Sequence, residues 1–339
     1  MVEEGGKWKM KTMQQLMDPS VAEADLPKNC LHLFQACTWD FGLEEKALEG
    51  RRINFIFAIK QRNDGKINSH KWFFQAIAKF LKPQQCLMLD IGTKADDYAV
   101  AKLYKYMLQS PECGGCCGEI EVDLTEYKSL SKYLVRAAQF YEYKLSHTPD
   151  KAMESFFGYN SVLPGAYCMF RWKAISGAPM DAFFKLVNST KEPTCPEANE
   201  YLAEDRVMCL QIYIKENAGY YLCYLPDAKA VTDAPELLMV LFKQRRRWMN
   251  GALFAAWRVV FNCGRMINCS STSKHPIYRQ VGIFFFMLYF MVNQVLTLFV
   301  CALFFVCIKI FAKQFLVFLT TDHQLLYGAI EVKKWVEGP

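Results

Sequence analysis

Residues 86–93 read Cys-Leu-Met-Leu-Asp-Ile-Gly-Thr, a short apolar run that ends on a carboxylate and a turn. An earlier apolar run, Ile53–Ile59, ends in a similar way at Lys60. Short apolar runs bounded by turn residues are typical of buried strands. In α/β sheets, ligands bind beyond the carboxyl ends of the strands. Lys60 and Asp90 are therefore candidates for ligand contact.

The segment between these two runs predicts a helix. Residues 70–81 carry apolar side chains at helical spacing, with Ser69 as the predicted N-cap and Pro83 as the stop. Strand, helix and strand in this order predict an α/β fold with a mixed, mostly parallel sheet. Farther along we expect helices over 95–109, 131–145, 201–214 and from about 235, a strand over 220–224, and a loop at the glycine-rich residues 114–119.

Charge and cysteine content narrow the class of protein. The net charge is +6, and the stretch from Lys243 to Arg279 holds eight Lys or Arg and no acidic residue. No nucleic-acid motif accompanies this patch, so we expect no nucleic-acid partner. Cys113, Cys116 and Cys117 form the one tight cysteine cluster. Because a second pair is missing, zinc is the weaker alternative, and we interpret the cysteines as small apolar residues of a reduced intracellular protein.

A long uncharged apolar run, Val281–Ile308, predicts a transmembrane helix. About 20 apolar residues span the hydrocarbon layer, and a buried core helix is the alternative. The basic stretch before this run predicts contact with membrane lipid and places the large N-terminal part on the cytosolic side. We expect this membrane to be the plasma membrane.

Three groups of residues are candidates for catalysis or for binding a metal or substrate. Asp90 suits a divalent cation that bridges a diphosphate, and a turn-capping carboxylate is the alternative. Glu204 and Asp205 are adjacent on a predicted helix, so they point in different directions; a general base is one interpretation and a solvated acidic face is the other. The third group is the basic cluster at residues 244–248.

The cluster reads Gln-Arg-Arg-Arg-Trp. Gln244, Arg247 and Trp248 share one face of a helix, because spacings of three and four bring residues together. Arginine offers a planar fork for phosphate oxygens, and tryptophan offers a flat surface for a sugar ring. Arg245 and Arg246 are expected to face lipid or structure. A lipid anchor that uses the same charges is the alternative.

Several blocks of this chain resemble chitin synthases, which are processive membrane glycosyltransferases with a GT-A (Rossmann-like) fold. The resemblance covers about Leu31 to Ile308. Its blocks are KQRNDGKINSHKWFF (60–74), LMLDIGTKADDYAVAKLYKYM (87–107), GGCCGEI (114–120), QFYEYKLSH (139–147), ESFFGYNSVLPGA (154–166), YLAEDR (201–206), AVTDAPE (230–236) and QRRRWMNG (244–251). Residues 68–72 and 162–166 favour chitin synthases over cellulose or hyaluronan synthases.

The resemblance implies a role for individual residues. Asp205 would be the catalytic base, and Asp90 would hold the divalent metal, Mg²⁺ or Mn²⁺, on UDP. The implied substrate contacts are Lys60 on the donor diphosphate, Pro164 and Gly165 in the sugar pocket, Glu204 beside the base, and Gln244, Arg247 and Trp248 on the diphosphate and the end of the growing chain. The implied reaction is inverting transfer of N-acetylglucosamine from UDP-N-acetylglucosamine to the 4-hydroxyl of a growing β-1,4-linked chitin chain.

The same resemblance sets the domain plan. Residues 1–50 would be an incomplete N-terminal remainder of the catalytic domain, and 51–248 the GT-A catalytic domain. An interfacial basic segment (249–279), a transmembrane helix (281–308) and a C-terminal segment (309–339) would follow. The family's upstream Tyr-Asn-Glu and downstream Trp-Gly-Thr signatures are not found, so we interpret the chain as a fragment or truncated form. A catalytically inactive, membrane-anchored partner of a full synthase and a cellulose- or hyaluronan-type synthase remain alternatives, and a homo-oligomer is left open.

Overall fold

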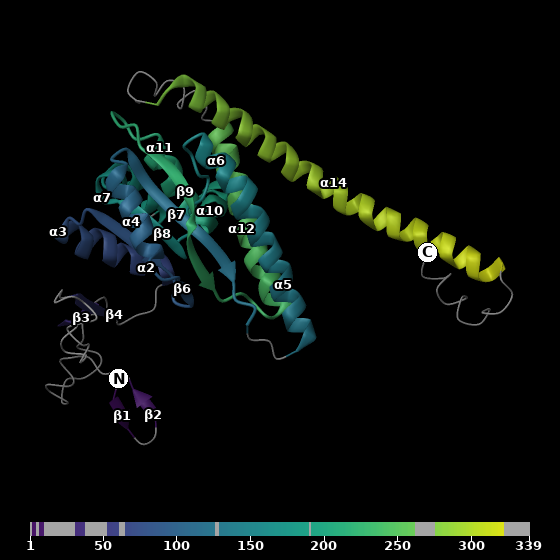
Figure 1. Ribbon diagram of the computed structural model, residues 1–339, viewed down its shortest axis with the longest axis horizontal. Helices are drawn as coiled ribbons and strands as arrows, with labels where there is room; N and C mark the ends of the chain where they lie inside the picture. The colour runs from purple at the N-terminus through teal and green to yellow at the C-terminus, as the bar shows by residue number, and fades with distance from the viewer. Residues whose placement is uncertain are drawn as a thin grey trace. The chain divides into compact units, whose positions relative to one another are not determined.

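The computed structural model describes residues 2–4, 7–9, 31–37, 53–60, 65–125, 129–189, 191–261 and 275–321. The chain divides into two compact units, Met1–Pro83 and Gln84–Pro339 (Figure 1). In the first unit, strands β1 (Val2–Glu4) and β2 (Lys7–Lys9) pair antiparallel, as do β3 (Leu31–Cys37) and β4 (Asn54–Lys60). The predicted strand at Ile53–Ile59 is therefore confirmed.

The helix after β4 begins earlier than the sequence suggests. It runs through α2 (Gly65–Lys71), a π-helix (Trp72–Ala78) and α3 (Lys79–Leu81). Ser69 lies inside α2 and is not an N-cap, because its hydroxyl reaches back to the carbonyl of Gly65, four residues earlier, at 3.5 Å. The predicted end is confirmed: Lys82 adopts a left-handed conformation with φ of 47°, and Pro83 follows.

The second unit contains a five-stranded mixed sheet in the order β5-β8-β7-β9-β6 (Figure 1). Its strands are β5 (Gln85–Leu89), β6 (Thr93–Ala95), β7 (Cys113–Val122), β8 (Tyr167–Arg171) and β9 (Tyr221–Thr232). In this sheet only β7 and β9 pair in parallel, while β5–β8, β7–β8 and β6–β9 are antiparallel. The prediction of a mostly parallel sheet is wrong, since β8 lies antiparallel between the like-directed β5 and β7.

Strand β7 contains the glycine-rich residues that predicted a loop. A Cβ atom on Gly118 would lie 1.8 Å from the carbonyl oxygen of Ala228, where β9 bulges against β7. A Cβ atom on Gly115 would lie 2.8 Å from side-chain carbons of Leu163 and Phe170. Glycine is needed here for close approach inside a sheet, so its usual meaning as a loop residue does not apply.

Helices cover this sheet and carry the remaining predicted elements. They are α4 (Ala99–Gln109), α5 (Leu130–Leu145), a π-helix (Ser146–Lys151), α6 (Ala152–Phe156), α7 (Trp172–Ile175), α8 (Ala178–Phe183), α9 (Lys185–Asn188), α10 (Cys195–Glu200), a 3₁₀ turn (Tyr201–Ala203), α11 (Glu204–Tyr213) and α12 (Leu238–Phe261). Leu103 and Met107 of α4 are fully buried in the main core with the thiols of Cys113 and Cys116. The helices predicted near 95–109, 131–145, 201–214 and from about 235 are confirmed.

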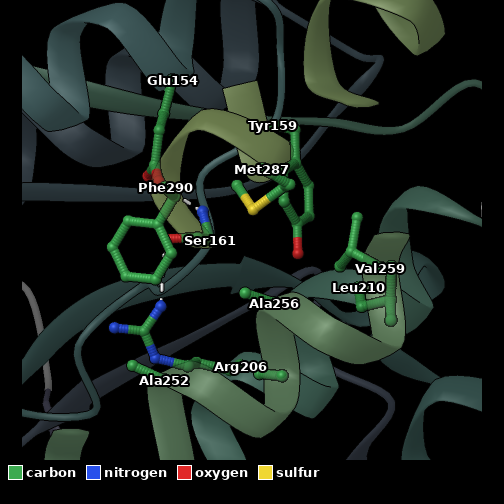
Figure 2. Close-up of a pocket in the computed structure, with 11 residues that line it drawn as sticks. Glu154, Tyr159, Ser161, Arg206, Leu210, Ala252, Ala256, Val259, Met287 and Phe290 are labelled. Carbon is green, nitrogen blue, oxygen red and sulfur yellow. Dashed lines mark hydrogen bonds between the residues drawn. The ribbon is translucent and has the colours of Figure 1, made fainter. Parts of the chain in front are cut away.

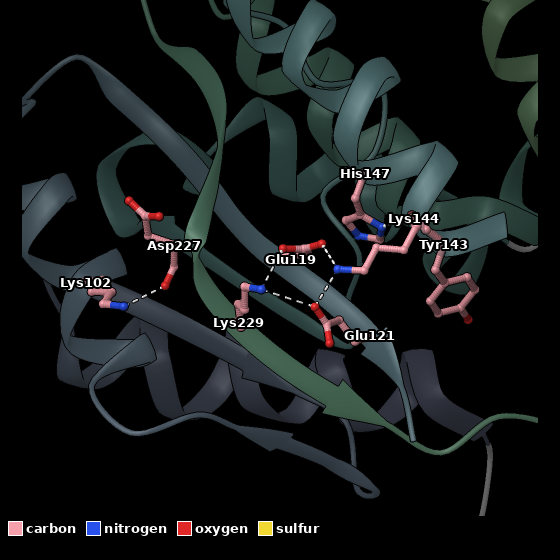
Figure 3. A network of polar contacts seen from close by, with 8 residues as sticks. All are labelled: Lys102, Glu119, Glu121, Tyr143, Lys144, His147, Asp227 and Lys229. Atoms are coloured by element: carbon pink, nitrogen blue, oxygen red, sulfur yellow. Dashed lines mark hydrogen bonds and ion pairs between the residues drawn. The ribbon is translucent and has the colours of Figure 1, made fainter. Parts of the chain in front are cut away.

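Ion pairs connect helix α5 to the sheet. The Nζ atom of Lys144 lies 2.6 Å from a carboxylate oxygen of Glu119 and 2.6 Å from one of Glu121, both on β7 (Figure 3). Lys229 of β9 approaches the same two carboxylates at 3.7 and 3.3 Å. The hydrogen bond from Lys144 lowers the pKa of Glu121. Because Glu119 is almost fully buried, this network fixes the end of α5 over β7.

The apolar run predicted to span a membrane lies within one long helix, α14 (Ile277–Thr321). Ile283 and Met287 near its start are buried, whereas most of its apolar side chains farther along are exposed. A search restricted to the described residues finds no helix with the length and hydropathy of a membrane span.

Candidate active site

The loop 159–166 and helix α11 bring together two groups of predicted site residues. The backbone N–H of Gly165 donates a hydrogen bond to Oδ2 of Asp205 at 3.0 Å. The backbone N–H of Leu163 points at Sγ of Cys209 at 3.2 Å. Asp205 and Cys209 are four residues apart and share one face of α11. The loop therefore lies along the first turns of α11, with Pro164 and Gly165 beside Asp205.

Asp90 joins the same region through the backbone. Its N–H donates to the carbonyl of Ala166 at 3.0 Å, and its own carbonyl accepts a bond from the N–H of Thr93 at 3.1 Å. Gly92, with φ of 94°, supplies the left-handed residue of this turn. Since Ala166 follows Gly165, successive contacts connect Asp90, the loop and Asp205.

Buried polar side chains make hydrogen bonds to the loop 159–166, and several of them are drawn in Figure 2. The Nζ atom of Lys151 donates to the carbonyl of Val162 at 2.6 Å, and Oε2 of Glu154 accepts from the N–H of Ser161 at 2.9 Å. Arg206 donates to the hydroxyl of Ser161 at 3.1 Å. Lys151 and Glu154 are 3% and 7% exposed. Burial raises the pKa of Glu154, while the charge of Lys151 opposes that change.

Sequence reasoning missed Lys151, Glu154 and Arg206 as supporting residues. Glu154 and Arg206 fall inside the family-like blocks 154–166 and 201–206, but their burial could not be read from those blocks. The available signal was a Lys and a Glu three residues apart in a helical segment that leads into an apolar, turn-rich stretch. In the fold, Glu154 and Arg206 both line a small pocket, together with Tyr159, Ser161 and several Ala, Leu, Val, Met and Phe side chains (Figure 2).

Helix α12 presents the Gln-Arg-Arg-Arg-Trp cluster beside the same turn of α11. Gly251 lies against Ala203, because a Cβ atom on Gly251 would come within 2.5 Å of the Cβ of Ala203. Ala203 directly precedes the acid pair. With 3.6 residues per turn, Gln244 and Arg247 lie on the same side of α12 as Gly251. The predicted face of the cluster is thus turned toward the start of α11.

Individual side chains on this face differ in their surroundings. The Oε1 atom of Gln244 is buried and has no hydrogen-bond partner among the described residues. Arg247 is exposed, and Trp248 is 37% exposed. Glu204 is half-buried in the first turn of α11. A buried carbonyl acceptor and exposed arginine and indole groups form a surface that suits a polar ligand with ring faces.

Arg245 packs against protein. Its Nη2 atom lies 2.7 Å from Oε2 of Glu142 on α5, and its guanidinium carbon lies 4.4 Å from the centre of the Trp248 ring. Of the two expectations for Arg245, lipid or structure, the contacts support structure. Arg246 is exposed.

Lys60 is the one predicted site residue in the first unit. It ends β4 as expected, and its Nζ atom donates to the carbonyl of Gly65 at 3.0 Å. The predicted turn between these residues lies outside the described residues. The contact of Lys60 with a donor diphosphate stays a prediction.

The cysteine cluster lies inside the sheet. Cys113, Cys116 and Cys117 are fully buried on β7, and Sγ of Cys113 lies 3.6 Å from Sγ of Cys223 on β9. Within the described part of the chain, no group of three or more His, Cys, Asp or Glu residues is arranged to hold a metal ion by itself. The burial of these thiols agrees with their interpretation as small apolar residues.

Comparison with known proteins identifies the class. Residues 7–263 match the model of the chitin synthase-like glycosyltransferase domain. Chitin synthase 2 of Mycosarcoma maydis is 39% identical over 256 residues, which are 75% of this chain and 24% of that protein. Chitin synthase 1 of Phytophthora sojae is 35% identical over 310 residues, 90% of this chain and 33% of its own length. Chitin synthase C of Aspergillus oryzae is 42% identical over 211 residues, 60% of this chain and 23% of its own.

The match defines a glycosyltransferase domain and covers most of the chain. The chain belongs to the chitin synthase family, and it spans between about a quarter and a third of the length of these curated relatives.

Proposed function

We propose that this chain carries the catalytic centre of a chitin synthase. It would transfer N-acetylglucosamine from UDP-N-acetylglucosamine to the 4-hydroxyl of a growing chitin chain, with inversion at the anomeric carbon. The observation that carries this proposal is the hydrogen bond from Gly165 to Asp205, since it joins the predicted sugar-pocket loop to the predicted base. Membership of the family supports the substrate class.

In this mechanism Asp205 removes the proton of the acceptor hydroxyl, whose oxygen attacks the anomeric carbon from the face opposite UDP. The hydrogen bond from the N–H of Gly165 stabilises the carboxylate and helps to fix its orientation. General-base assistance is worth about 10²–10⁴ in rate. The positive charge of Arg247 would stabilise the charge that develops on the leaving UDP.

A divalent cation fits the residues present. Mg²⁺ and Mn²⁺ accept a site made of one or two carboxylates completed by substrate phosphates, and Asp90 supplies such a carboxylate at the edge of the loop. The lack of a closed three-ligand cluster in the described residues agrees with a cation that is completed by the diphosphate. Once bound, the cation would neutralise diphosphate charge. The turn at Gly92 and the bond to Ala166 would position Asp90 for it.

We further propose that the enzyme works at a membrane with the catalytic domain facing the cytosol. The uncharged run Val281–Ile308 and the basic stretch Lys243–Arg279 support this proposal, as do the exposed apolar side chains along α14. Anionic lipid headgroups would bind the basic stretch, and a plasma-membrane location suits the export of a cell-wall polymer. Nucleic acid is not among the partners we propose.

One experiment separates this function from the alternatives. The full 339-residue chain is titrated with UDP in the presence of Mg²⁺ or Mn²⁺. It is then assayed for transfer from labelled UDP-N-acetylglucosamine, UDP-glucose and UDP-glucuronate to a chito-oligosaccharide. We expect binding of UDP and transfer of N-acetylglucosamine alone, into a product that chitinase digests. Binding without any transfer would favour an inactive partner of a full synthase, and transfer of another sugar would favour a cellulose- or hyaluronan-type enzyme.

A further inference from the structure

Trp248 lies on the proposed substrate face but is poorly enclosed. Its side chain is 37% exposed, and a large side chain with that exposure needs neighbours to fix its orientation. Gln244 and Arg247 on the same face do not stack on it in any contact that the structure records. The contacts that do reach the indole come from Arg245 and from Tyr143 on α5.

Arg245 lies over the indole ring. Its guanidinium carbon is 4.4 Å from the centre of the Trp248 ring and 5.7 Å from the centre of the Tyr143 ring. The two ring centres are 6.5 Å apart and their planes are tilted by 34°. Arg245 and Trp248 are three residues apart on α12, so this packing follows from helix geometry. The guanidinium therefore lies against the indole and within cation–π distance of the Tyr143 ring, and the three groups form a triangle.

Glu142 fixes the other end of the guanidinium. Its Oε2 atom lies 2.7 Å from Nη2 of Arg245, and the Arg245 side chain is only 14% exposed. Neither Nη atom makes a hydrogen bond of regular geometry with a described residue, so charge and ring contacts hold the group. A lipid anchor would need an exposed cation. The buried, paired state of Arg245 does not suit that role.

We propose that Arg245, held by Glu142 and Tyr143, is a positioning residue that covers one face of Trp248 and leaves the other face for a sugar ring of the acceptor chain. This inference rests on the proposed function, and it assigns to one residue of the cluster a role that differs from those of Gln244 and Arg247. In this role Arg245 itself does not touch substrate, because it lies about 120° around α12 from Gly251, outside the face that Gly251 turns toward α11.

Lysine cannot replace arginine in this role. A guanidinium is planar and stacks on aromatic rings, whereas an ammonium is a compact and strongly hydrated charge. Arg245→Lys therefore keeps the charge and the pairing with Glu142 but loses the stacking. Arg246→Lys is the matched control, because Arg246 is exposed and belongs to the same triplet.

The test measures transfer to chitotetraose and, by calorimetry, binding of chitotetraose to the full chain. We expect Arg245→Lys to raise the KM and Kd for chitotetraose about tenfold, as loss of one desolvated stacking contact would. In Arg245→Lys, the KM for UDP-N-acetylglucosamine should change less than about twofold. In Arg246→Lys, the KM and Kd for chitotetraose should also change less than about twofold. In a Trp248→Leu background, which has no ring to stack on, Arg245→Lys should add less than twofold, since its effect passes through the indole.

Two results would overturn the inference. One is an equal effect of Arg245→Lys and Arg246→Lys on chitotetraose. The other is the same loss from Arg245→Lys whether or not Trp248 is present. The proposed function fails separately, by absence of transfer from UDP-N-acetylglucosamine, and calorimetry still tests the stacking in that case. A wild-type chain that transfers sugar but does not bind chitotetraose would also overturn the positioning role.

Discussion

The two sides of the proposed site are built in different ways. The loop 159–166 is held from behind by buried charges, with Lys151 and Glu154 each less than a tenth exposed. The cluster on α12 is held by ring stacking and by an ion pair whose Glu142 partner is 52% exposed. A buried network costs several kcal/mol to break, whereas exposed pairs contribute about 0–1 kcal/mol. The loop side is thus the more rigid of the two, and the α12 side has room to adapt to a bound ligand.

The largest expected effect comes from a change at Asp205, the proposed base, which lies beside the loop. Asp205→Asn keeps the shape and the bond from Gly165 but cannot accept the acceptor proton. Transfer should fall by at least about 10²–10⁴, while the Kd for UDP stays within a few-fold. Polymerisation at a normal rate by the purified variant would show that another group is the base. Comparable loss of UDP binding would instead indicate that the side chain has a structural role.

The next effect tests whether the loop side is the rigid one. Lys151→Met removes the buried charge that acts on Glu154 and the donor to the carbonyl of Val162, so it should lower the free energy of unfolding by about 1–3 kcal/mol. Lys185→Met is the control, because the Lys185 side chain is 60% exposed in its pair with Glu197 and should cost less than about 1 kcal/mol. Thermal unfolding monitored by circular dichroism measures both. Similar values for the two variants would contradict the comparison.

Acid should lower the free energy of unfolding, because His147 is buried in the folded chain. Nδ1 of His147 donates a hydrogen bond to the carbonyl of Tyr143 at 2.8 Å; both residues are drawn in Figure 3. The imidazole ring also packs near the ring of Tyr224. Burial, with the nearby charge of Lys151, lowers the pKa of His147 from 6.5 to about 4. As the pH falls below 6.5, His147 becomes protonated in the unfolded chain, whereas in the folded chain it is protonated only near pH 4. Stability present at neutral pH is therefore lost through this window, by about 3 kcal/mol.

The comparison for this pH effect is His147→Gln, which cannot titrate. Its unfolding free energy should depend less on pH between 6.5 and 4 than that of the wild-type chain. Glu119 and Lys144 also act on His147, with opposite signs, so the difference between the two proteins is the quantity to measure. Parallel pH curves for the two proteins would exclude His147 as the titrating group.

A smaller effect concerns the approach of α12 to α11. Alanine stabilises an exposed helix by about 1 kcal/mol relative to glycine, but a Cβ atom on Gly251 would lie 2.5 Å from Cβ and 3.0 Å from the backbone nitrogen of Ala203. Overpacking costs about 1–3 kcal/mol, so Gly251→Ala should be destabilising by about 1 kcal/mol and should raise the KM for acceptor. Ala203→Gly in the same chain should restore both. Absence of rescue would show that the two helices do not meet there in solution.

Local patterns in the sequence predicted most helices, because α4, α5, α11 and α12 carry their periodicity and their boundaries within a few turns. They also singled out Asp90 and Asp205 as candidate site residues, and the family resemblance added Gly165. The pairing of strands was not predictable in the same way, since the insertion of β8 between β5 and β7 is decided by contacts between distant segments. The loop expected at residues 114–119 failed for a related reason: what requires glycine there is the bulge of β9 at Ala228, which no nearby residue signals.

The site also combines residues that local sequence suggests with contacts between distant segments that it does not. Asp205 and Gly165 were recognised separately, but their hydrogen bond joins residues 40 positions apart. Lys151 and Glu154 were missed because their importance comes from burial, and burial of a charged side chain cannot be read from its neighbours in sequence. Arg245 was assigned to lipid or structure, and only the position of α5 beside α12 gives it specific partners.

The parallel pairing of β7 with β9 has a consequence for how the domain folds. Cys113 and Cys223, which meet in this pair, are 110 positions apart along the chain. The centre of the sheet therefore forms only after the intervening helices have been synthesised and have brought β9 into place, and contacts of such long range slow folding. Until then, the apolar and thiol-rich β7 has an unpaired edge on the nascent chain. The nascent chain is most prone to aggregate during this interval, and a chaperone would protect it most then.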